Sequence, residues 1–260
     1  MPYFFKTIII TSILVGALLG LWCLSYQVTY LSLVFVAIIL GIVAYSSISL
    51  KMHQRKCFAK CYLNSESFLA RLLSSRIMVS LIYFIISVCV SVSIAYSVLD
   101  YKIMMWGLVF INIIICATIF SVCKRMLKSI IKEDYLMLLS REISIGIGTF
   151  IFIVLSCYIQ WHTSMPNYLQ PSLMETIKEA SNSIYSSCDY IDYFLKFKKS
   201  LESLTWWGML KAETIEIDKR FIYVAWGVFI FYNALSGIAI TRLMGQIIYW
   251  LSEYFRKNNE

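Results

Sequence analysis

The chain has 260 residues, of which 60% are hydrophobic, and it carries a net charge of +8 and a mean hydropathy of +0.73. Soluble domains are closer to half apolar, and here the excess is gathered into long runs, which excludes an ordinary soluble enzyme. The positive charge does not indicate a nucleic-acid partner, because cytoplasmic loops of membrane proteins carry excess Lys and Arg.

Six apolar runs are each long enough to cross a membrane. A span needs about 20 residues, because only a continuous helix satisfies its own backbone hydrogen bonds in lipid. We therefore predict an all-α fold, a polytopic membrane helical bundle of about six transmembrane helices, with a helical extracytoplasmic segment between spans five and six. The runs lie at residues 7–25, 28–50, 77–98, 103–123, 143–161 and 221–241.

These runs divide the chain into three parts. We expect the first run to be retained as a helix, because it reaches Leu24 without a signal-peptide cleavage site. The predicted parts are a bundle of five spans at 1–161 with connections at 51–76 and 124–142, an extracytoplasmic helical loop at 162–220, and a last span with a cytoplasmic tail at 221–260.

The charges of the connections predict the orientation. Basic residues outnumber acidic ones in 51–76, in 124–142 and in the C-terminal stretch, whereas 162–219 holds six lysines against eight acids. With six spans, all the basic regions fall on one side, so the positive-inside rule places both termini in the cytoplasm. High Ile, Ser, Lys and Tyr with few Pro is typical of an AT-rich gene, and we expect a bacterial inner membrane.

The connection at 124–142 has the pattern of one amphipathic helix. Lys124, Lys128 and Lys132 follow each other at intervals of four residues and share one face, while apolar residues take the other. Such a helix is expected to lie on the inner leaflet and to attract anionic lipid. A surface for a regulator or a partner is the alternative.

The residue pattern of the extracytoplasmic loop predicts a helix of about 30 residues. Ser172 and Glu175 form a capping box at its start, and apolar residues then follow in steps of four and three, as in a coiled-coil seam. Ser187 and Lys198 break this pattern. The seam either packs on the chain's own spans or docks a second subunit. Its members are Leu173, Ile177, Ala180, Ile184, Ile191, Phe194 and Leu201, and we select Ile177, Ile184, Ile191 and Phe194 as the interaction residues.

The same loop ends in two tryptophans, Trp206 and Trp207, followed by a glycine. We expect the glycine to end the helix and the two indoles to anchor it at the membrane interface. Beyond the loop, the chain from Phe221 to about Phe255 contains no helix breaker. The last helix is therefore expected to continue past the membrane or to bend along its surface.

Small and polar residues recur at helical spacing within the spans. Small residues let helix backbones approach closely, and asparagine can hydrogen bond between helices. These positions predict packing within one chain, contacts in a homo-oligomer or with other membrane subunits, or the lining of a pore. They are Asn233, Gly237, Thr241 and Gly245 in the last run, Gly16 and Gly20 in the first, and Asn112 in the fourth.

No span has an ionisable residue near its centre. Arg141, Glu142 and Arg242 lie at the ends of spans, where long side chains are expected to extend toward water. A proton-coupled transporter or a voltage sensor needs a charged residue within a span, and both are therefore disfavoured.

Catalytic and metal-binding motifs are missing from the sequence. It has no phosphate-binding loop, nucleophile elbow, zinc-protease motif or dinucleotide fingerprint, and we expect no enzymatic activity and no cofactor. His53, Cys57 and Cys61 share one helix face, but about 12 Å separates the outer two, which is too far for one zinc ion. We expect no metal site.

Two functions remain. The first is a non-enzymatic inner-membrane subunit of a larger or homo-oligomeric assembly, of the kind found in secretion, conjugation, exclusion, immunity or defence. The alternative is a channel or passive transporter formed by an oligomer, with Asn233 or Asn112 facing the pore.

Overall fold

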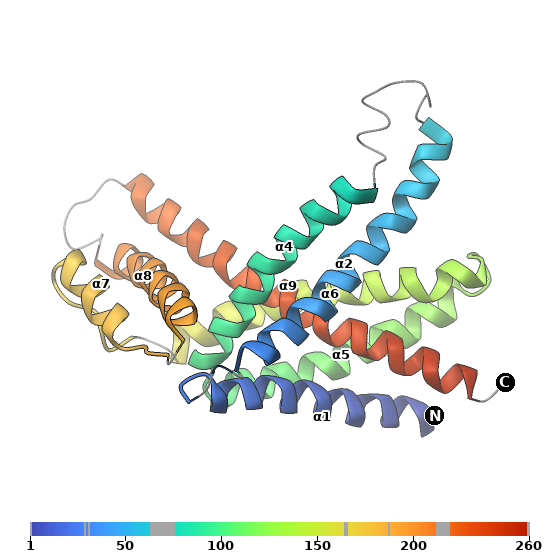
Figure 1. Cartoon of the computed structure of the whole chain (residues 1–260), viewed down its shortest axis with the longest axis horizontal. Coiled ribbons are helices and arrows are strands. Elements are labelled where there is room, and N and C mark those ends of the chain that lie inside the picture. Colours follow the sequence, from blue (N-terminus) through green and yellow to red (C-terminus); the bar gives the residue numbers. More distant parts are fainter. Residues whose placement is uncertain are drawn as a thin grey trace.

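The structure is a computed structural model, and it describes residues 2–28, 30, 32–62, 76–163, 166–186, 188–211 and 219–258. Every element of secondary structure in these residues is a helix (Figure 1). The elements are α1 (Pro2–Ser25), α2 (Ser32–Tyr62), α4 (Arg76–Ser97), the short 3₁₀ helix η1 (Val98–Asp100), α5 (Ile103–Leu127), α6 (Glu133–Thr163), α7 (Leu173–Asn182), α8 (Asp189–Lys211) and α9 (Lys219–Lys257).

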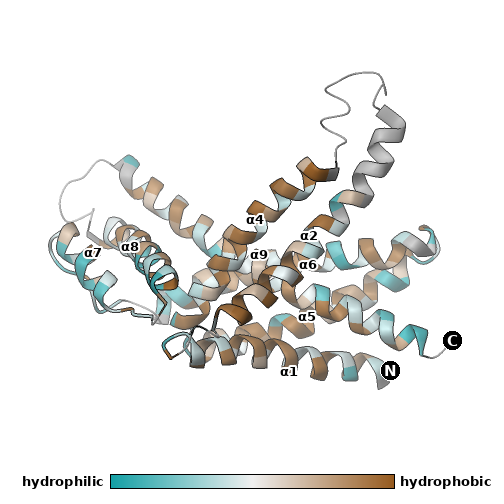
Figure 2. Cartoon of the chain, viewed as in Figure 1, coloured by the Kyte–Doolittle hydropathy of each residue, from teal (hydrophilic) through white to brown (hydrophobic). Residues whose placement is uncertain are grey.

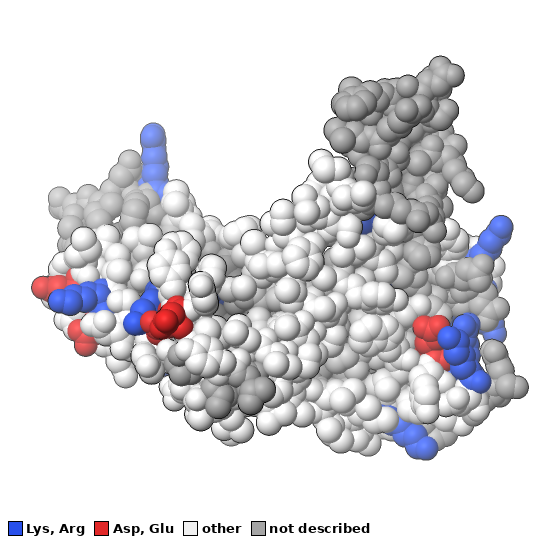
Figure 3. Space-filling view, viewed as in Figure 1, with Lys and Arg blue, Asp and Glu red and all other residues white. Residues whose placement is uncertain are grey.

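Six of these helices are long and apolar enough to cross a membrane, namely α1, α2, α4, α5, α6 and α9. Figure 2 shows hydrophobic residues along the middle of the long helices and hydrophilic ones toward their ends and on α7 and α8. On the face drawn in Figure 3, charged side chains gather toward the two ends of the molecule. The predicted all-α, multi-pass membrane bundle is confirmed.

Both termini lie at the same end of the bundle, which we call the terminal end (Figure 1). There the rings of Tyr3 and Phe255 approach to 5.8 Å between centroids. The turn between α5 and α6 lies at this end too, and α7 and α8 lie at the opposite end, the α8 end. The predicted common side for the two termini therefore agrees with the fold.

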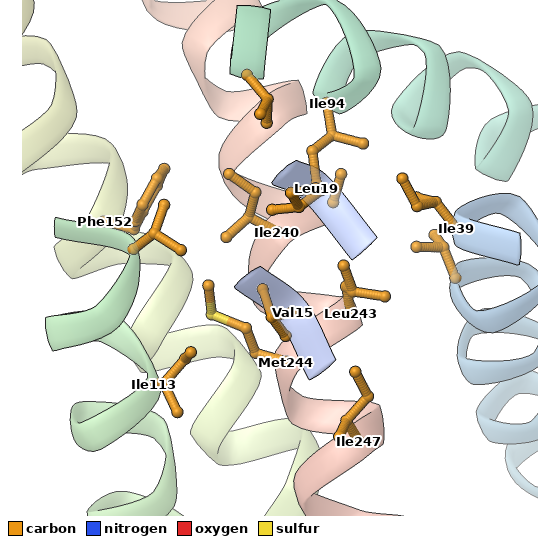
Figure 4. Close-up of a cluster of buried hydrophobic side chains, with 14 of the residues drawn as sticks. Val15, Leu19, Ile39, Ile94, Ile113, Phe152, Ile240, Leu243, Met244 and Ile247 are labelled. Carbon is orange, nitrogen blue, oxygen red and sulfur yellow. The ribbon is translucent and has the colours of Figure 1, made fainter. Parts of the chain in front are cut away.

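Helix α9 is the centre of the bundle. It runs unbroken for 39 residues, which confirms that the last helix continues past Arg242. At about 1.5 Å per residue it is about 58 Å long, nearly twice the thickness of a hydrocarbon core. It contacts α1, α2, α4, α5, α6 and α8. Its residues Ile240, Leu243, Met244 and Ile247 meet side chains from five other helices in one apolar cluster (Figure 4).

Close packing of α5, α6 and α9 sets the register of the bundle. The Asn112 amide of α5 donates a hydrogen bond to Thr241 Oγ1 of α9 at 3.3 Å. A methyl group at Gly148 of α6 would collide with Cys116, and one at Gly245 would lie 2.5 Å from Ile145 Cγ1. Both positions therefore require glycine for the helices to approach.

This register places the first third of α9 beyond the start of α5. Ile103 precedes Asn112 by the same number of residues as Tyr232 precedes Thr241, so Tyr232 lies level with the beginning of α5. Residues 219–231 of α9 extend further, toward α7 and α8 (Figure 1). The α8 end is thus a layer built from α7, α8 and the N-terminal part of α9.

The prediction of one amphipathic helix at 124–142 is wrong. Helix α5 continues to Leu127, a turn follows, and α6 begins at Glu133. Lys124 therefore lies on α5, Lys128 is its C-cap residue and Lys132 lies in the turn, so the three lysines do not share one helix face. The polar residues belong to the ends of two spans that are longer than their apolar runs.

The prediction of one continuous helix in the 162–220 loop is also wrong. Two separate helices, α7 and α8, pack against each other with a break after Asn182. Ser186 fixes this break, because its backbone N–H donates to Asp192 Oδ1 and its hydroxyl donates to the carbonyl of Tyr26 at the end of α1. Ser172 is the N-cap residue of α7, as expected, but its side chain makes no capping hydrogen bond.

Candidate functional site

The candidate site is the outer junction, which we define as Lys198, Lys199 and Glu202 of α8 with Ser93, Tyr96, Ser97, Asp100, Tyr168 and Tyr232. Helix α8 packs on α9, and the three charged side chains of α8 point to the residues where α4 and η1 end. None of the apolar runs contains these charged residues, so a search restricted to the spans does not find them.

Lys198 is a buried cation of the junction, with 9% of its surface exposed. Its ammonium nitrogen lies 2.7 Å from the carbonyl oxygen of Ser93 and 3.2 Å from each of the hydroxyls of Ser93 and Ser97. It also lies 4.4 Å and 4.3 Å from the ring centroids of Tyr96 and Tyr232. Among the described residues, no salt bridge reaches Lys198, so hydroxyl and carbonyl oxygens and aromatic faces replace a carboxylate.

Lys199 and Glu202 form the ionic part of the junction. Lys199 lies 2.8 Å from Asp100 Oδ2 and 3.3 Å from Glu202 Oε2. Glu202 also accepts hydrogen bonds from the hydroxyls of Tyr96 at 2.6 Å and Tyr168 at 3.4 Å. The Glu202 carboxylate thus joins α8 to α4 and to the segment before α7. These contacts fix the position of α8 relative to both segments.

Burial sets the protonation of these groups. It lowers the pKa of Lys198 well below 10.5, although the charges of Glu202 and Asp100 oppose this. For Lys199, burial acts in the same direction, but attraction to Glu202 and Asp100 outweighs it and raises the pKa. Burial also raises the pKa of Glu202, against the opposing effect of Lys199.

A buried lysine with a lowered pKa is a potential nucleophile. The adjoining cavity, however, has a volume of about 50 Å³, which has room for a few waters. Glu202, Tyr96 and Tyr232 line this cavity, and Lys198 does not. Because Lys198 does not line this cavity, the contacts of its amine in the described residues are those of a structural clamp.

The expectation that the two tryptophans anchor α8 at the membrane interface is wrong. The helix continues past Gly208 to Lys211, and Trp206 and Trp207 are both buried. The Trp206 ring packs on Trp161 of α6 and Phe229 of α9, with centroids 6.2 Å and 5.4 Å away. Both indoles are core residues of the α8 end.

The opposite face of α8 carries exposed aromatic residues. Tyr190 is 80% exposed and Tyr193 69%, and Phe194 and Phe197 are more than half exposed. They recur at helical spacing and form one stripe, which we call the aromatic ridge. The ridge faces away from the outer junction, whose residues contact α4 and η1 from another face of the same helix.

The selected interaction residues of the loop separate in the structure. Ile184 and Ile191 pack in an apolar cluster with Tyr96 and Leu195, and Ile177 is half-buried. Phe194 alone of the four lies on the ridge. Of the four selected residues, two thus pack inward, one is half-buried and one is exposed.

The polar residues of the spans lie inside the chain's own bundle. Asn112 is fully buried, and Asn233 is buried and donates to the carbonyl of Phe229 in its own helix. Gly237, Thr241 and Gly245 face α6. Among the alternatives, packing within one chain describes these positions, and neither asparagine faces outward toward a second copy.

Gly16 and Gly20 of α1 are packed less closely. A methyl group at Gly16 would lie 3.5 Å from Phe110 of α5, and one at Gly20 would meet no neighbour within 4 Å. The pair does not form a tight helix contact within the chain. Its predicted role in contacts between chains stays a prediction.

A second buried polar group lies toward the terminal end. Arg141 does not extend toward water as expected, because it is only 1% exposed. Its guanidinium donates to Gln246 Oε1 at 2.6 Å, to Glu142 Oε1 at 2.7 Å and to the carbonyl of Ser46 at 3.3 Å. Glu142 also pairs with Arg242 at 3.7 Å. These contacts link α2, α6 and α9.

No group of three or more potential metal ligands occurs among the described residues. His53, Cys57 and Cys61 lie on α2, but their side chains are outside the part of the chain that the structure describes. The absence of a metal site stays a prediction.

Comparison of the chain with protein-family models, with curated proteins and with solved structures finds no match in any of the three.

Proposed function

We propose that the chain is a non-catalytic subunit of a membrane assembly, anchored by its spans in a bacterial inner membrane with the terminal end in the cytoplasm. The aromatic ridge of α8 is the surface that meets a partner protein. The observation that carries the proposal is a row of exposed aromatic side chains on a helix that buried charges hold in place.

The core supports a binding role over a conducting one. Large apolar side chains from α1, α2, α4, α5, α6 and α9 meet between the outer junction and Arg141, and Leu243 and Ile240 are fully buried there (Figure 4). Within the described spans, such packing leaves no polar path through one chain. An oligomeric channel would need polar residues on an outward face, and Asn112 and Asn233 are buried.

The ridge has the composition of a protein interface. Tyrosine and phenylalanine are enriched at such surfaces, where a polar rim surrounds an aromatic centre. Beside the ridge lies a hollow of about 410 Å³, lined by Tyr193 and Phe197 together with Asp189, Asp192, Lys196 and Ser200. Charged groups mixed with aromatic rings suit a protein partner better than the hydrocarbon of a lipid.

The outer junction supports the ridge. An interface residue binds more tightly when its helix is already ordered, because less conformational entropy is lost on association. Contacts of Lys198, Lys199 and Glu202 to α4 and η1 hold α8 on its inner face, so that the ridge is presented rigidly. A structural role for these buried charges agrees with the small volume, about 50 Å³, of the cavity beside Glu202.

The proposal is tested by photo-crosslinking in native membranes. A photoreactive phenylalanine at Tyr193 or Phe197 should give an adduct of one defined mass, either twice that of the chain or that of the chain plus one other subunit. The same group at Lys178, which is exposed on α7, is the matched control and should give none. Lack of adducts from the ridge, with a monomeric mass in mild detergent, would contradict the proposal.

A second measurement separates a protein partner from lipid. A spin label at a Tyr193→Cys position should be shielded from both water-soluble nickel and lipid-soluble oxygen in native membranes. In reconstituted vesicles of the purified chain it should become accessible to nickel where the partner is another protein, and stay shielded where the partner is a second copy of the chain. Access to oxygen alone in both samples would place the ridge in lipid and contradict the docking proposal.

A further inference from the structure

A groove between α1, α5 and α9 opens at the terminal end of the bundle. It has a volume of about 700 Å³, within the range of pockets that enclose small molecules. Its position is the level where the spans change from apolar to polar, since Lys124 and Arg125 are in the last turn of α5. The lining residues are Tyr3, Phe4, Thr7, Ala117, Phe120, Ser121, Lys124, Arg125, Lys128, Ile248, Ser252, Phe255 and Arg256.

The polar wall of the groove is strongly basic. Four of its residues are cations, Lys124, Arg125, Lys128 and Arg256, and no carboxylate is among its described lining residues. The described lining of the groove is therefore positively charged, which attracts an anion.

The other wall is apolar and continues into the bundle. Phe120 and Ile248 belong to a buried cluster that also contains Cys116 and Ala117, and Phe4 packs against it. Ser121 of α5 and Ser252 of α9 also line the groove. A ligand that fits both walls has an anionic head and a hydrocarbon tail.

We propose that the groove binds one anionic phospholipid of the adjacent leaflet. Its phosphate lies among Lys124, Arg125, Lys128 and Arg256, with the serine hydroxyls as further donors, and one acyl chain follows Phe120 and Ile248. Basic pockets between transmembrane helices bind such headgroups through combined charge and hydrogen bonding. The inference does not depend on the proposed partner of α8.

The site differs from simple attraction of a basic surface to lipid. Lys132, on the turn after α5, does not line the groove, whereas Arg125 and Arg256 do. Removing charge from the groove should therefore weaken binding far more than removing equal charge beside it. This difference provides a matched pair of variants.

The test uses the full-length chain in a mild detergent, with bound lipid counted by native mass spectrometry during titration with phosphatidylglycerol or phosphatidylcholine. One molecule of phosphatidylglycerol should bind tightly, and phosphatidylcholine at least about tenfold more weakly. Arg125→Gln with Lys128→Gln should weaken phosphatidylglycerol binding about tenfold or more. Lys6→Gln with Lys132→Gln, which removes the same charge from exposed lysines at the same end, should leave it within about twofold.

Two further arms distinguish a phospholipid seated in the groove from a phosphate ion held by the cations alone. Ser121→Trp fills the groove and keeps every charge, so it should also weaken phosphatidylglycerol binding, with an unchanged elution volume showing that the chain is folded. Inorganic phosphate should not displace the lipid at millimolar concentration. Equal losses from the two double variants, equal binding of the two lipids, or displacement by phosphate would each overturn the proposal.

Discussion

Two buried cations, Arg141 near the terminal end and Lys198 near the α8 end, are surrounded by different kinds of polar group. Arg141 is surrounded by a carboxylate, an amide oxygen and a backbone carbonyl. Lys198 has hydroxyls, a carbonyl and two tyrosine rings, and its pKa is lowered. A guanidinium cannot lose its proton, so it needs full pairing, whereas an ammonium can be buried with less because it can become neutral.

The comparison predicts the largest effect at Arg141. Arg141→Met leaves Gln246 and part of Glu142 without a partner inside the bundle, and loss of one member of a buried charge pair costs about 3–5 kcal/mol. The free energy of unfolding, measured by titration with sodium dodecyl sulfate in mixed micelles, should fall by that amount. Arg125→Met, at an exposed arginine of the same end, should stay within about 0.5 kcal/mol. Equal losses of unfolding free energy in the two variants would mean that the buried contacts of Arg141 do not stabilise the bundle.

A second variant tests whether the Arg141 contacts depend on close helix packing. Gly245 lies beside Gln246, and a methyl group there would collide with Ile145 of α6. Gly245→Ala should push α9 away from α6 and destabilise the bundle by about 1–3 kcal/mol. Gly20→Ala, where nothing lies within 4 Å, should be neutral or slightly stabilising, because alanine favours a helix. A stable Gly245→Ala variant would show that Arg141 tolerates a wider gap.

At the α8 end, Glu202 should matter more than Lys198. Glu202→Gln weakens two tyrosine hydrogen bonds and one ion pair at once, with an expected cost of about 2 kcal/mol. Limited proteolysis should then cut α8 faster while the spans stay protected. Glu179→Gln, on the exposed face of α7, should not change the cleavage rate. Unaltered cleavage in Glu202→Gln would mean that apolar packing alone holds α8.

Hydropathy and charge were enough to predict the six spans and the common side of the termini, because bilayer thickness and the positive-inside rule act on long runs. They did not predict which charged residues at the edges of the runs or between them are buried in the folded chain. Arg141 stands at the edge of an apolar run, and only the pairing of α6 with α2 and α9 buries it. Lys198 had one visible signal, as a charged break in the apolar seam of the loop. The burial of Lys198 against α4 could not be predicted from this break in the seam, because it depends on contacts between segments far apart in the sequence.

The turns were missed for a local reason. Lys128 and Lys132 fit one helix phase with Lys124, but periodicity within one segment does not show where a helix ends. The α5–α6 turn exists because two spans extend past their apolar runs. Likewise, the break after Asn182 depends on hydrogen bonds from Ser186 to Asp192 and to Tyr26, and the second of these joins residues far apart in the sequence.

The smallest effect, and the sharpest test of the comparison, is the pH dependence from Lys198. Its pKa in the folded chain lies below the 10.5 that the unfolded chain regains, so between these values the unfolded state binds more protons. Stability therefore rises with pH across this window. The groups that face the amine, Lys199 and Glu202 on α8, Asp100 on η1 and the two tyrosines, add their own slopes. Wild type must therefore be compared with Lys198→Met at each pH.

Lys198→Met keeps the length of the side chain, removes the charge and should cost less than about 1 kcal/mol at neutral pH, because no carboxylate loses a direct partner. The stability difference, wild type minus variant, should grow as pH rises toward 10. The same plot for Lys178→Met, at an exposed lysine, should be flat. A difference for Lys198→Met that shrinks with rising pH would mean that the buried ammonium keeps its proton. The aromatic faces of Tyr96 and Tyr232 would then compensate a full charge, and the contrast with Arg141 would disappear.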